Sequence, residues 1–226
     1  MTFKTTALEK RNWTMVKIAE EKYDHLMIKI INSCTTSDIL EELTTLIFDK
    51  AILDPTFCPM YAKLCSDICD KLPTFQPTEP GARIVSFKKV LYNLCQSVFE
   101  GAEEIKELRV YPSDQKEKEM MLKLQTLGNI RFIGELRNQK VMLERIAHHI
   151  IVVLLGADEK ICPPEENVEA LCLFLKTIGK KPLRSKWINY AYLSHLKTVS
   201  NHPQLVTPQK YMIWETINYL RFNGWP

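Results

Sequence analysis

Apolar side chains recur every three to four residues along almost the whole chain, and this period decides which folds the chain can adopt. An α-helix turns once in 3.6 residues, so this spacing places the apolar residues on one face of a helix. The sequence has no useful run of alternating apolar and polar residues, which a half-buried strand would need, and it has only 7 glycines. The chain is therefore predicted to be all-α.

Capping residues and prolines indicate where the helices begin and end. Asp38 with Glu41 predicts a helix start, and the apolar stripe of that helix continues to Leu53. Asp54 and Pro55 then predict a cap and the first position of the next helix, where a missing N–H costs nothing. Further helices are expected at 23–32, 84–99, 124–138, 141–155, 163–179, 186–199 and from 207 onward. About ten helices in five antiparallel pairs predict an α-α superhelix, a HEAT-repeat solenoid.

Two glycines, Gly128 and Gly134, interrupt an otherwise helical apolar pattern. Glycine inside a helix costs about 0.5–1 kcal/mol relative to alanine, so their presence predicts that neighbouring helices approach closely. The same helix has apolar residues on two sides, because Phe132 lies nearly opposite Ile130. Such a helix is either packed between neighbours or presents Phe132 to a partner, and burial statistics favour the core.

Length and composition describe one globular domain over residues 1–226, with 46% hydrophobic and 25% charged residues. The stretch 100–118 is charged and weakly periodic, and is expected to be a mobile insertion between repeats. No window has the roughly 18 apolar residues of a membrane helix, and the N-terminus lacks the apolar core of a signal peptide. We expect a cytoplasmic protein.

The seven cysteines are an odd number in a chain without a secretory signal, so they are interpreted as buried hydrophobes rather than disulfides. Cys65 and Cys69 share a helix face, and a zinc site with His148 and His149 would need a Cys-x-x-Cys pair that is missing. The sequence also has no phosphate-binding loop and no dinucleotide fingerprint. We expect no enzyme, no metal and no cofactor, and a metal enzyme or hydrolase is the weakest hypothesis.

The charge is unevenly distributed along the chain. Residues 1–120 have 16 basic and 19 acidic side chains, whereas residues 121–226 have 14 and 8. This asymmetry indicates an anionic partner for the second half, although scattered surface lysines produce the same pattern.

The run Leu127-Gly-Asn-Ile-Arg-Phe-Ile-Gly-Glu-Leu136 resembles the signature of the middle domain of eukaryotic translation initiation factor 4G, an all-helical HEAT-repeat module. Three further segments agree with that domain in the same order: 46–65, 87–101 and 166–179. The run Pro-Thr-Phe-Cys-Pro-Met-Tyr at 55–61 is most similar to the plant forms, including the plant factor (iso)4G. The resemblance extends from about residue 11 to residue 225.

This resemblance implies a scaffold that binds the DEAD-box helicase initiation factor 4A, raises its turnover and contacts RNA. Phe132 matches one helicase contact of the family, and Tyr211, within Pro-Gln-Lys-Tyr-Met at 208–212, matches another. A third contact is an apolar trio, for which the matching residues are Met15, Ile18 and Tyr23. Two departures alter this surface: Ala19-Glu20 replaces a Thr-Pro helix start, and the run 214–221 lacks most acidic residues of the family.

For RNA, the resemblance directs attention to lysine and arginine side chains near the turn at 179–182. These candidates are Lys176, Lys180, Lys181, Arg184 and Lys186, with Lys88 and Lys89 as a second patch. Such a cluster neutralises phosphates without reading sequence, and its binding is salt-sensitive. A solvated loop is the alternative.

The Tyr-x-x-x-x-Leu motif for the cap-binding protein is absent, so we expect contact with that protein only through regions outside this chain. A second hypothesis therefore is a short diverged paralogue that competes with the full-length factor. Another is a related middle-domain adaptor in messenger RNA metabolism.

Overall fold

The computed structural model describes residues 20–75, 84–107, 115–156 and 161–226. Within these ranges it has nine α-helices and one isolated antiparallel bridge, between Phe75 and Val85. The helices are α2 (Glu20–Ser33), α3 (Ser37–Leu53), α4 (Cys58–Lys71), α5 (Phe87–Glu107), α6 (Gln115–Asn138), α7 (Glu144–Leu155), α8 (Glu165–Ile178), α9 (Lys186–Ser200) and α10 (Thr207–Phe222). The prediction of an all-α fold is confirmed.

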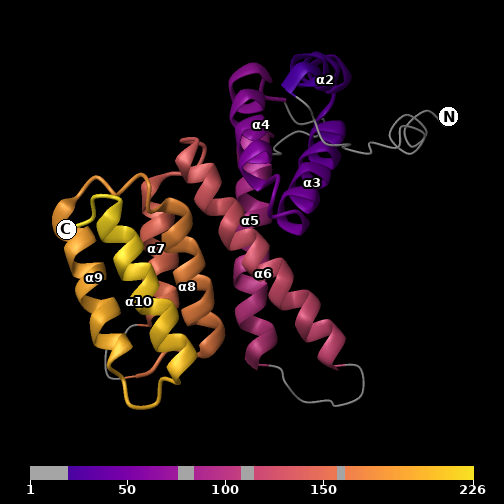
Figure 1. The fold of residues 1–226 in the computed structure, drawn as a ribbon. Coiled ribbons are helices and arrows are strands. Elements are labelled where there is room, and N and C mark those ends of the chain that lie inside the picture. The colour runs from indigo at the N-terminus through magenta and orange to yellow at the C-terminus, as the bar shows by residue number, and fades with distance from the viewer. Residues whose placement is uncertain (1–19, 76–83, 108–114, 157–160) are drawn as a thin grey trace.

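The helices stack as antiparallel pairs, so that every second helix belongs to one continuous row (Figure 1). In this row α2 packs on α4, α4 on α6, α6 on α8 and α8 on α10. The remaining helices, α3, α5, α7 and α9, each pack beside a helix of the row. Stacked helix pairs of this kind are the HEAT-like architecture expected from the apolar period.

The central member of the row is α6, which contacts α3, α4, α5, α7 and α8. Glycines permit these contacts. A Cβ added to Gly128 would lie 2.0 Å from the carbonyl oxygen of Ile52, at the end of α3. A Cβ added to Gly134 would lie 2.8 Å from Cγ2 of Thr177 in α8. The close approach of another backbone is therefore confirmed at Gly128, whereas at Gly134 the close neighbour is a side chain of the packed helix α8.

Some predicted boundaries are wrong in detail. Thr36, not Asp38, caps α3, because its hydroxyl accepts the N–H of Ile39. Asp54 does accept the N–H groups of Thr56 and Phe57, but Pro55 lies in a turn and the helix begins at Cys58. Helices also occupy both ends of the stretch 100–118, since α5 extends to Glu107 and α6 starts at Gln115. The remainder of the expected insertion, 108–114, lies outside the described residues.

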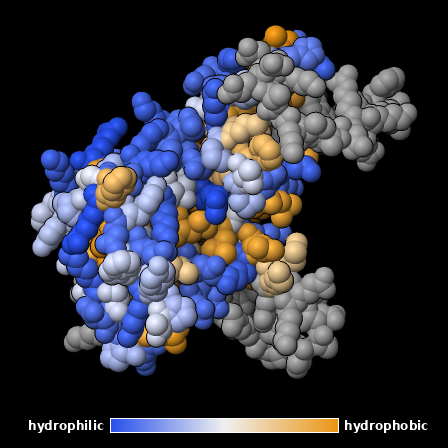
Figure 2. All heavy atoms as spheres, viewed as in Figure 1, coloured by the Kyte–Doolittle hydropathy of each residue, from blue (hydrophilic) through white to orange (hydrophobic). Residues whose placement is uncertain are grey.

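Exposed apolar side chains gather in the hollow between the two halves of the molecule. Figure 2 shows hydrophobic surface along α6, between α8 and the end of α3, whereas the face formed by α9 and α10 is mostly polar. Leu53, Met120 and Leu124 are exposed in this region. Below them, the core runs through the whole helix stack.

Candidate functional site

The predicted RNA-binding cations lie around the turn between α8 and α9, which we call the basic turn and define as residues 179–185. Lys176 is in the last turn of α8 and forms an ion pair with Glu215 of α10 at 3.3 Å. Lys180, Lys181, Arg184 and Lys186 are all exposed. The structure thus brings five of the seven predicted cations to one corner of the molecule.

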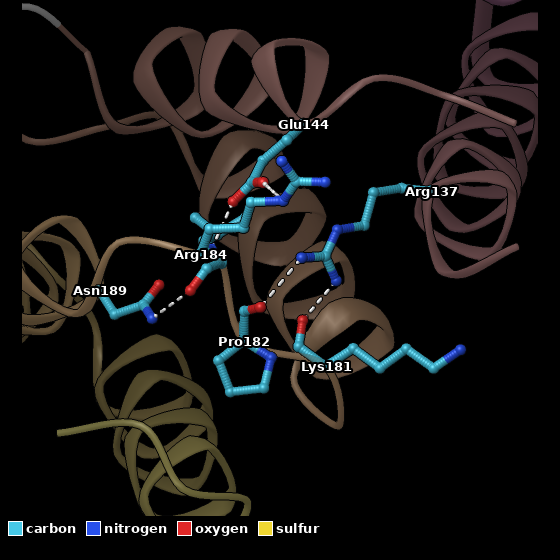
Figure 3. Close-up of polar contacts among 7 residues, drawn as sticks. Arg137, Glu144, Lys181, Pro182, Arg184 and Asn189 are labelled. Carbon is cyan, nitrogen blue, oxygen red and sulfur yellow. Dashed lines mark hydrogen bonds and ion pairs between the residues drawn. The ribbon is translucent and has the colours of Figure 1, made fainter. Parts of the chain in front are cut away.

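Arg137, at the end of α6, holds the backbone of the basic turn (Figure 3). Its guanidinium donates hydrogen bonds to the carbonyl of Lys181 and, at 3.1 Å, to the carbonyl of Pro182. Burial lowers the pKa of Arg137, and the Glu144 carboxylate opposes this shift. In the other direction, Nζ of Lys181 donates to the carbonyl of Asn138 at 2.9 Å. The end of α6 and the basic turn are therefore fastened together by reciprocal hydrogen bonds.

Three further side chains fix the remainder of the turn. The Glu144 carboxylate accepts the N–H of Arg184 at 2.6 Å and lies 3.5 Å from its Nε. Asn189 donates to the carbonyl of Leu183, and the Trp225 indole donates to the carbonyl of Gly179. The Arg184 side chain nevertheless remains 95% exposed. The turn thus presents its cations from a fixed backbone.

The second predicted patch lies on α5. Lys88 and Lys89 are exposed in the first turn of α5, where Lys88 lies near Cys69 of α4. The helix α5 packs on α3, α4 and α6, whereas the basic turn joins α8 and α9, so this patch belongs to a different helix pair.

The structure separates the predicted helicase contacts into different environments. Met15 and Ile18 lie outside the described residues. Tyr23 is half-buried on α2, where its hydroxyl donates to Asp67 of α4 at 2.5 Å and Nζ of Lys63 lies 5.2 Å from its ring centroid. Tyr23 therefore fastens α2 to α4 and leaves part of its ring exposed.

Phe132 is a core residue. Its side chain is 0% exposed, and its ring centroid lies 6.1 Å from that of Phe48 in α3. Direct contact of Phe132 with a helicase, as the resemblance implies, does not fit this burial. The physical reason is that α6 is packed on both sides, so the face that carries Phe132 is covered by α3.

Tyr211 is exposed, and its aromatic neighbour, Trp214, belongs to the run 214–221 that departs from the family pattern. Tyr211 is 60% exposed and Trp214 is 58% exposed. Their ring centroids lie 6.0 Å apart on α10. The i, i+3 spacing on one helix is the signal that predicts this pairing.

The residues considered for a zinc site do not come together as a metal centre. Cys65 is fully buried and burial raises its pKa, whereas Nδ1 of His148 lies 3.0 Å from the Tyr192 hydroxyl. Among the described residues, no group of three His, Cys, Asp or Glu side chains is placed to hold a metal ion.

A family model described as the MIF4G domain matches residues 8–220. The chain belongs to the MIF4G domain family. Its relatives include the eukaryotic translation initiation factor 4G of Arabidopsis thaliana, 36% identical over 210 residues that make up 88% of this chain and 12% of that protein. The corresponding rice factor (Oryza sativa subsp. japonica) is 35% identical over 214 residues, 88% of this chain and 11% of that protein. The chain thus spans only about an eighth of the length of these relatives.

The fold agrees with a solved MIF4G structure. The MIF4G domain of Trypanosoma cruzi translation initiation factor EIF4G5 has a TM-score of 0.53 and 20% identity, with 92% of each chain covered. The predicted family and the similarity to plant factors are confirmed. The MIF4G domain of these factors is a non-catalytic scaffold domain, as the sequence predicts. In the described part of this MIF4G domain, no helix is long and apolar enough to span a membrane.

Proposed function

We propose that this MIF4G domain is a scaffold of translation initiation that binds the DEAD-box helicase initiation factor 4A and contacts RNA in the cytoplasm. The observation that carries the proposal is the row of packed helices with aromatic side chains at both ends, Tyr23 on α2 and Tyr211 with Trp214 on α10. A two-lobed helicase requires two contacts at a set spacing. A scaffold that touches both lobes changes the balance between open and closed forms through its differential contacts.

The Tyr211–Trp214 pair is the principal helicase contact in this proposal. Tyrosine and tryptophan are enriched among the residues that dominate binding energy at protein interfaces. Both rings stand on one face of α10, whose inner side is packed on α8 and α9. Phe132 has a positioning role, because its packing against Phe48 sets the distance between α6 and α3.

The basic turn is the RNA contact. Eight basic side chains and only one acidic side chain, Glu215, lie between residues 170 and 226. Glu215 is paired with Lys176, while Glu144 faces Arg184 and Glu135 interacts with Lys180 and Lys181. The exposed cations Lys180, Lys181, Arg184 and Lys186 still outnumber the latter two carboxylates beside the turn. Phosphates would bind there through charge, so the affinity falls as salt rises.

The helicase contact is tested by the RNA-stimulated ATPase rate of factor 4A with and without the domain. Replacing both Tyr211 and Trp214 by alanine removes two contacts of the hot-spot type. The concentration of the domain that gives half-maximal ATPase stimulation is therefore expected to rise by at least about tenfold. Tyr92→Ala, which removes a partly exposed aromatic ring from α5, is the matched control and should leave the half-maximal concentration unchanged. Equal stimulation by the double variant and the wild type would refute the assignment.

A competitor of the full-length factor is the second candidate, and the surface of α10 favours it. Glu215, the single acidic side chain of that helix, forms an ion pair with Lys176. A helicase lobe that recognises acidic residues at this position would find fewer of them. Binding of the helicase without stimulation, together with inhibition when the domain is added to a translation extract, would establish the competitor and contradict the activating scaffold.

A further inference from the structure

Two large aromatic side chains stand exposed immediately after the basic turn. Trp187 is 77% exposed and Tyr190 is 60% exposed, both in the first half of α9. Residues three apart on a helix lie side by side on the same face. Tryptophan and tyrosine are enriched at binding surfaces, where the apolar body of the ring meets a partner and its polar group stays wet.

The buried side of α9 shows which way these rings face. Leu193 and Leu196 are buried in the core, and Tyr192 contacts His148 of α7 through its hydroxyl. Trp187 and Tyr190 therefore point away from the helix stack. Within the described residues, neither ring has an aromatic partner of the kind that Tyr211 and Trp214 provide for each other.

The surroundings of these rings are cationic. Arg184 and Lys186 are exposed within three residues of Trp187, and Lys180 is exposed in the same turn. The helix α9 itself has no acidic residue. A partner that covers this corner must therefore offer negative charge next to flat unsaturated rings. That combination is typical of a single-stranded nucleic acid, whose bases are unpaired and whose phosphates are regularly spaced.

Hydrogen bonds fix the backbone of the basic turn and of the first turn of α9. Arg137, Glu144 and Asn189 fix the backbone of residues 181–184 with hydrogen bonds from three different helices. The side chain of Ser185 caps α9 by accepting the N–H of Ile188, which sets the direction of the first turn. The backbone that carries the cations and the two rings is thus held in place before a strand binds, which reduces the ordering cost of binding.

We infer that Trp187 and Tyr190 are a stacking platform for unpaired bases of single-stranded RNA, while Arg184 and Lys186 contact its phosphates. The inference rests on the proposed RNA contact and makes it specific for single strands. A duplex would meet the same cations, but its bases are stacked on one another and cannot lie on the two rings.

The test measures binding of a fluorescein-labelled 15-nucleotide oligouridine, and of a 15-base-pair RNA duplex, over a range of salt concentrations. The variants are Trp187→Leu, Trp187→Phe and Tyr190→Leu, with Tyr92→Leu as the control on α5 and circular dichroism as the check of folding. Leucine keeps the ring's apolar character without its stacking face, whereas phenylalanine keeps a stacking face. Each leucine variant at 187 or 190 is expected to weaken single-strand binding by about five- to a hundredfold. Trp187→Phe should restore most of the loss at that position.

Salt dependence separates this inference from the proposed function. Replacing Arg184 by glutamine removes one phosphate contact and should lower the slope of log affinity against log salt by about 0.7. The leucine variants should lower affinity at every salt concentration without changing that slope.

Leucine variants that bind oligouridine like the wild type, while Arg184→Gln still weakens binding, would overturn the platform and leave the RNA contact standing. If the leucine variants and Arg184→Gln all bind RNA with wild-type affinity, both the stacking platform and the proposed RNA contact are refuted. Equal affinity for the strand and the duplex would also overturn the platform. Unchanged oligouridine affinity of Trp187→Leu would overturn the platform as well, because leucine can replace tryptophan in a purely apolar contact of the kind proteins make, but not in base stacking.

Discussion

The contact between Gly128 and the end of α3 makes a sharp prediction about stability. Alanine at position 128 would place its Cβ 2.0 Å from the carbonyl oxygen of Ile52 and 2.8 Å from the carbonyl carbon. These are backbone atoms, so no side-chain rotation relieves the overlap, and α3 and α6 must move apart. Overpacking of this kind costs about 3 kcal/mol at the upper end of its usual range, and alanine returns about 1 kcal/mol of helix propensity. We expect Gly128→Ala to lower the free energy of unfolding by about 2 kcal/mol.

The chain offers a matched control in Gly101 of α5, where an added Cβ meets no atom within 4 Å. Gly101→Ala should raise the free energy of unfolding by about 0.5–1 kcal/mol through helix propensity alone. Urea unfolding followed by circular dichroism at equal m-values measures both changes. The reasoning is refuted if Gly128→Ala is as stable as the wild type, or if the two variants shift in the same direction.

Three further perturbations test other contacts. Tyr23→Phe removes the hydroxyl that donates to Asp67 and should cost about 0.5–1.5 kcal/mol in urea unfolding, whereas no loss would mean that water replaces the bond. Arg137→Leu leaves the carbonyls of Lys181 and Pro182 without their donor, and should cost about 1–2 kcal/mol and speed amide exchange in the basic turn. Burial raises the pKa of the Cys58 thiol to about 12, so the folded state keeps a proton that the unfolded chain releases. Stability from this thiol is complete below the ordinary thiol pKa of about 8.5 and declines as pH rises towards 12, so Cys58→Ala should show the shallower decline between pH 8 and pH 10.5.

The parts of the fold that the sequence predicts are those with a local signal. The cost of glycine in a helix is a local property. Gly128 and Gly134 therefore predict close packing, although they do not identify the helices that pack there. Tyr211 is singled out by the family resemblance rather than by a local pattern, and it is exposed on α10. The apolar period predicts a start of α6 at residue 124, whereas the helix begins at Gln115, because its first turns are rich in charged residues and weakly periodic.

The parts that could not be predicted depend on contacts between distant residues. Arg137 lies 44 residues from Lys181, and Glu144 lies 40 residues from Arg184. No periodicity connects them, so the sequence showed a cluster of cations without the side chains that fix it. The burial of Phe132 was one of two open alternatives, and only its packing against Phe48 of α3 decides between them.

The position of α6 also has a consequence for how the molecule unfolds. In most helical solenoids each repeat touches only the adjacent ones, so that the ends can unravel while the middle stays folded. The same nearest-neighbour rule holds here, and α6, with 24 residues, contacts both adjacent pairs, α3 with α4 on one side and α7 with α8 on the other. If the helices on one side of α6 unfold, the apolar side chains of α6 that they cover become exposed to water. We therefore expect the two halves to unfold in one cooperative transition, so that a destabilising substitution in one half also lowers the stability of the other.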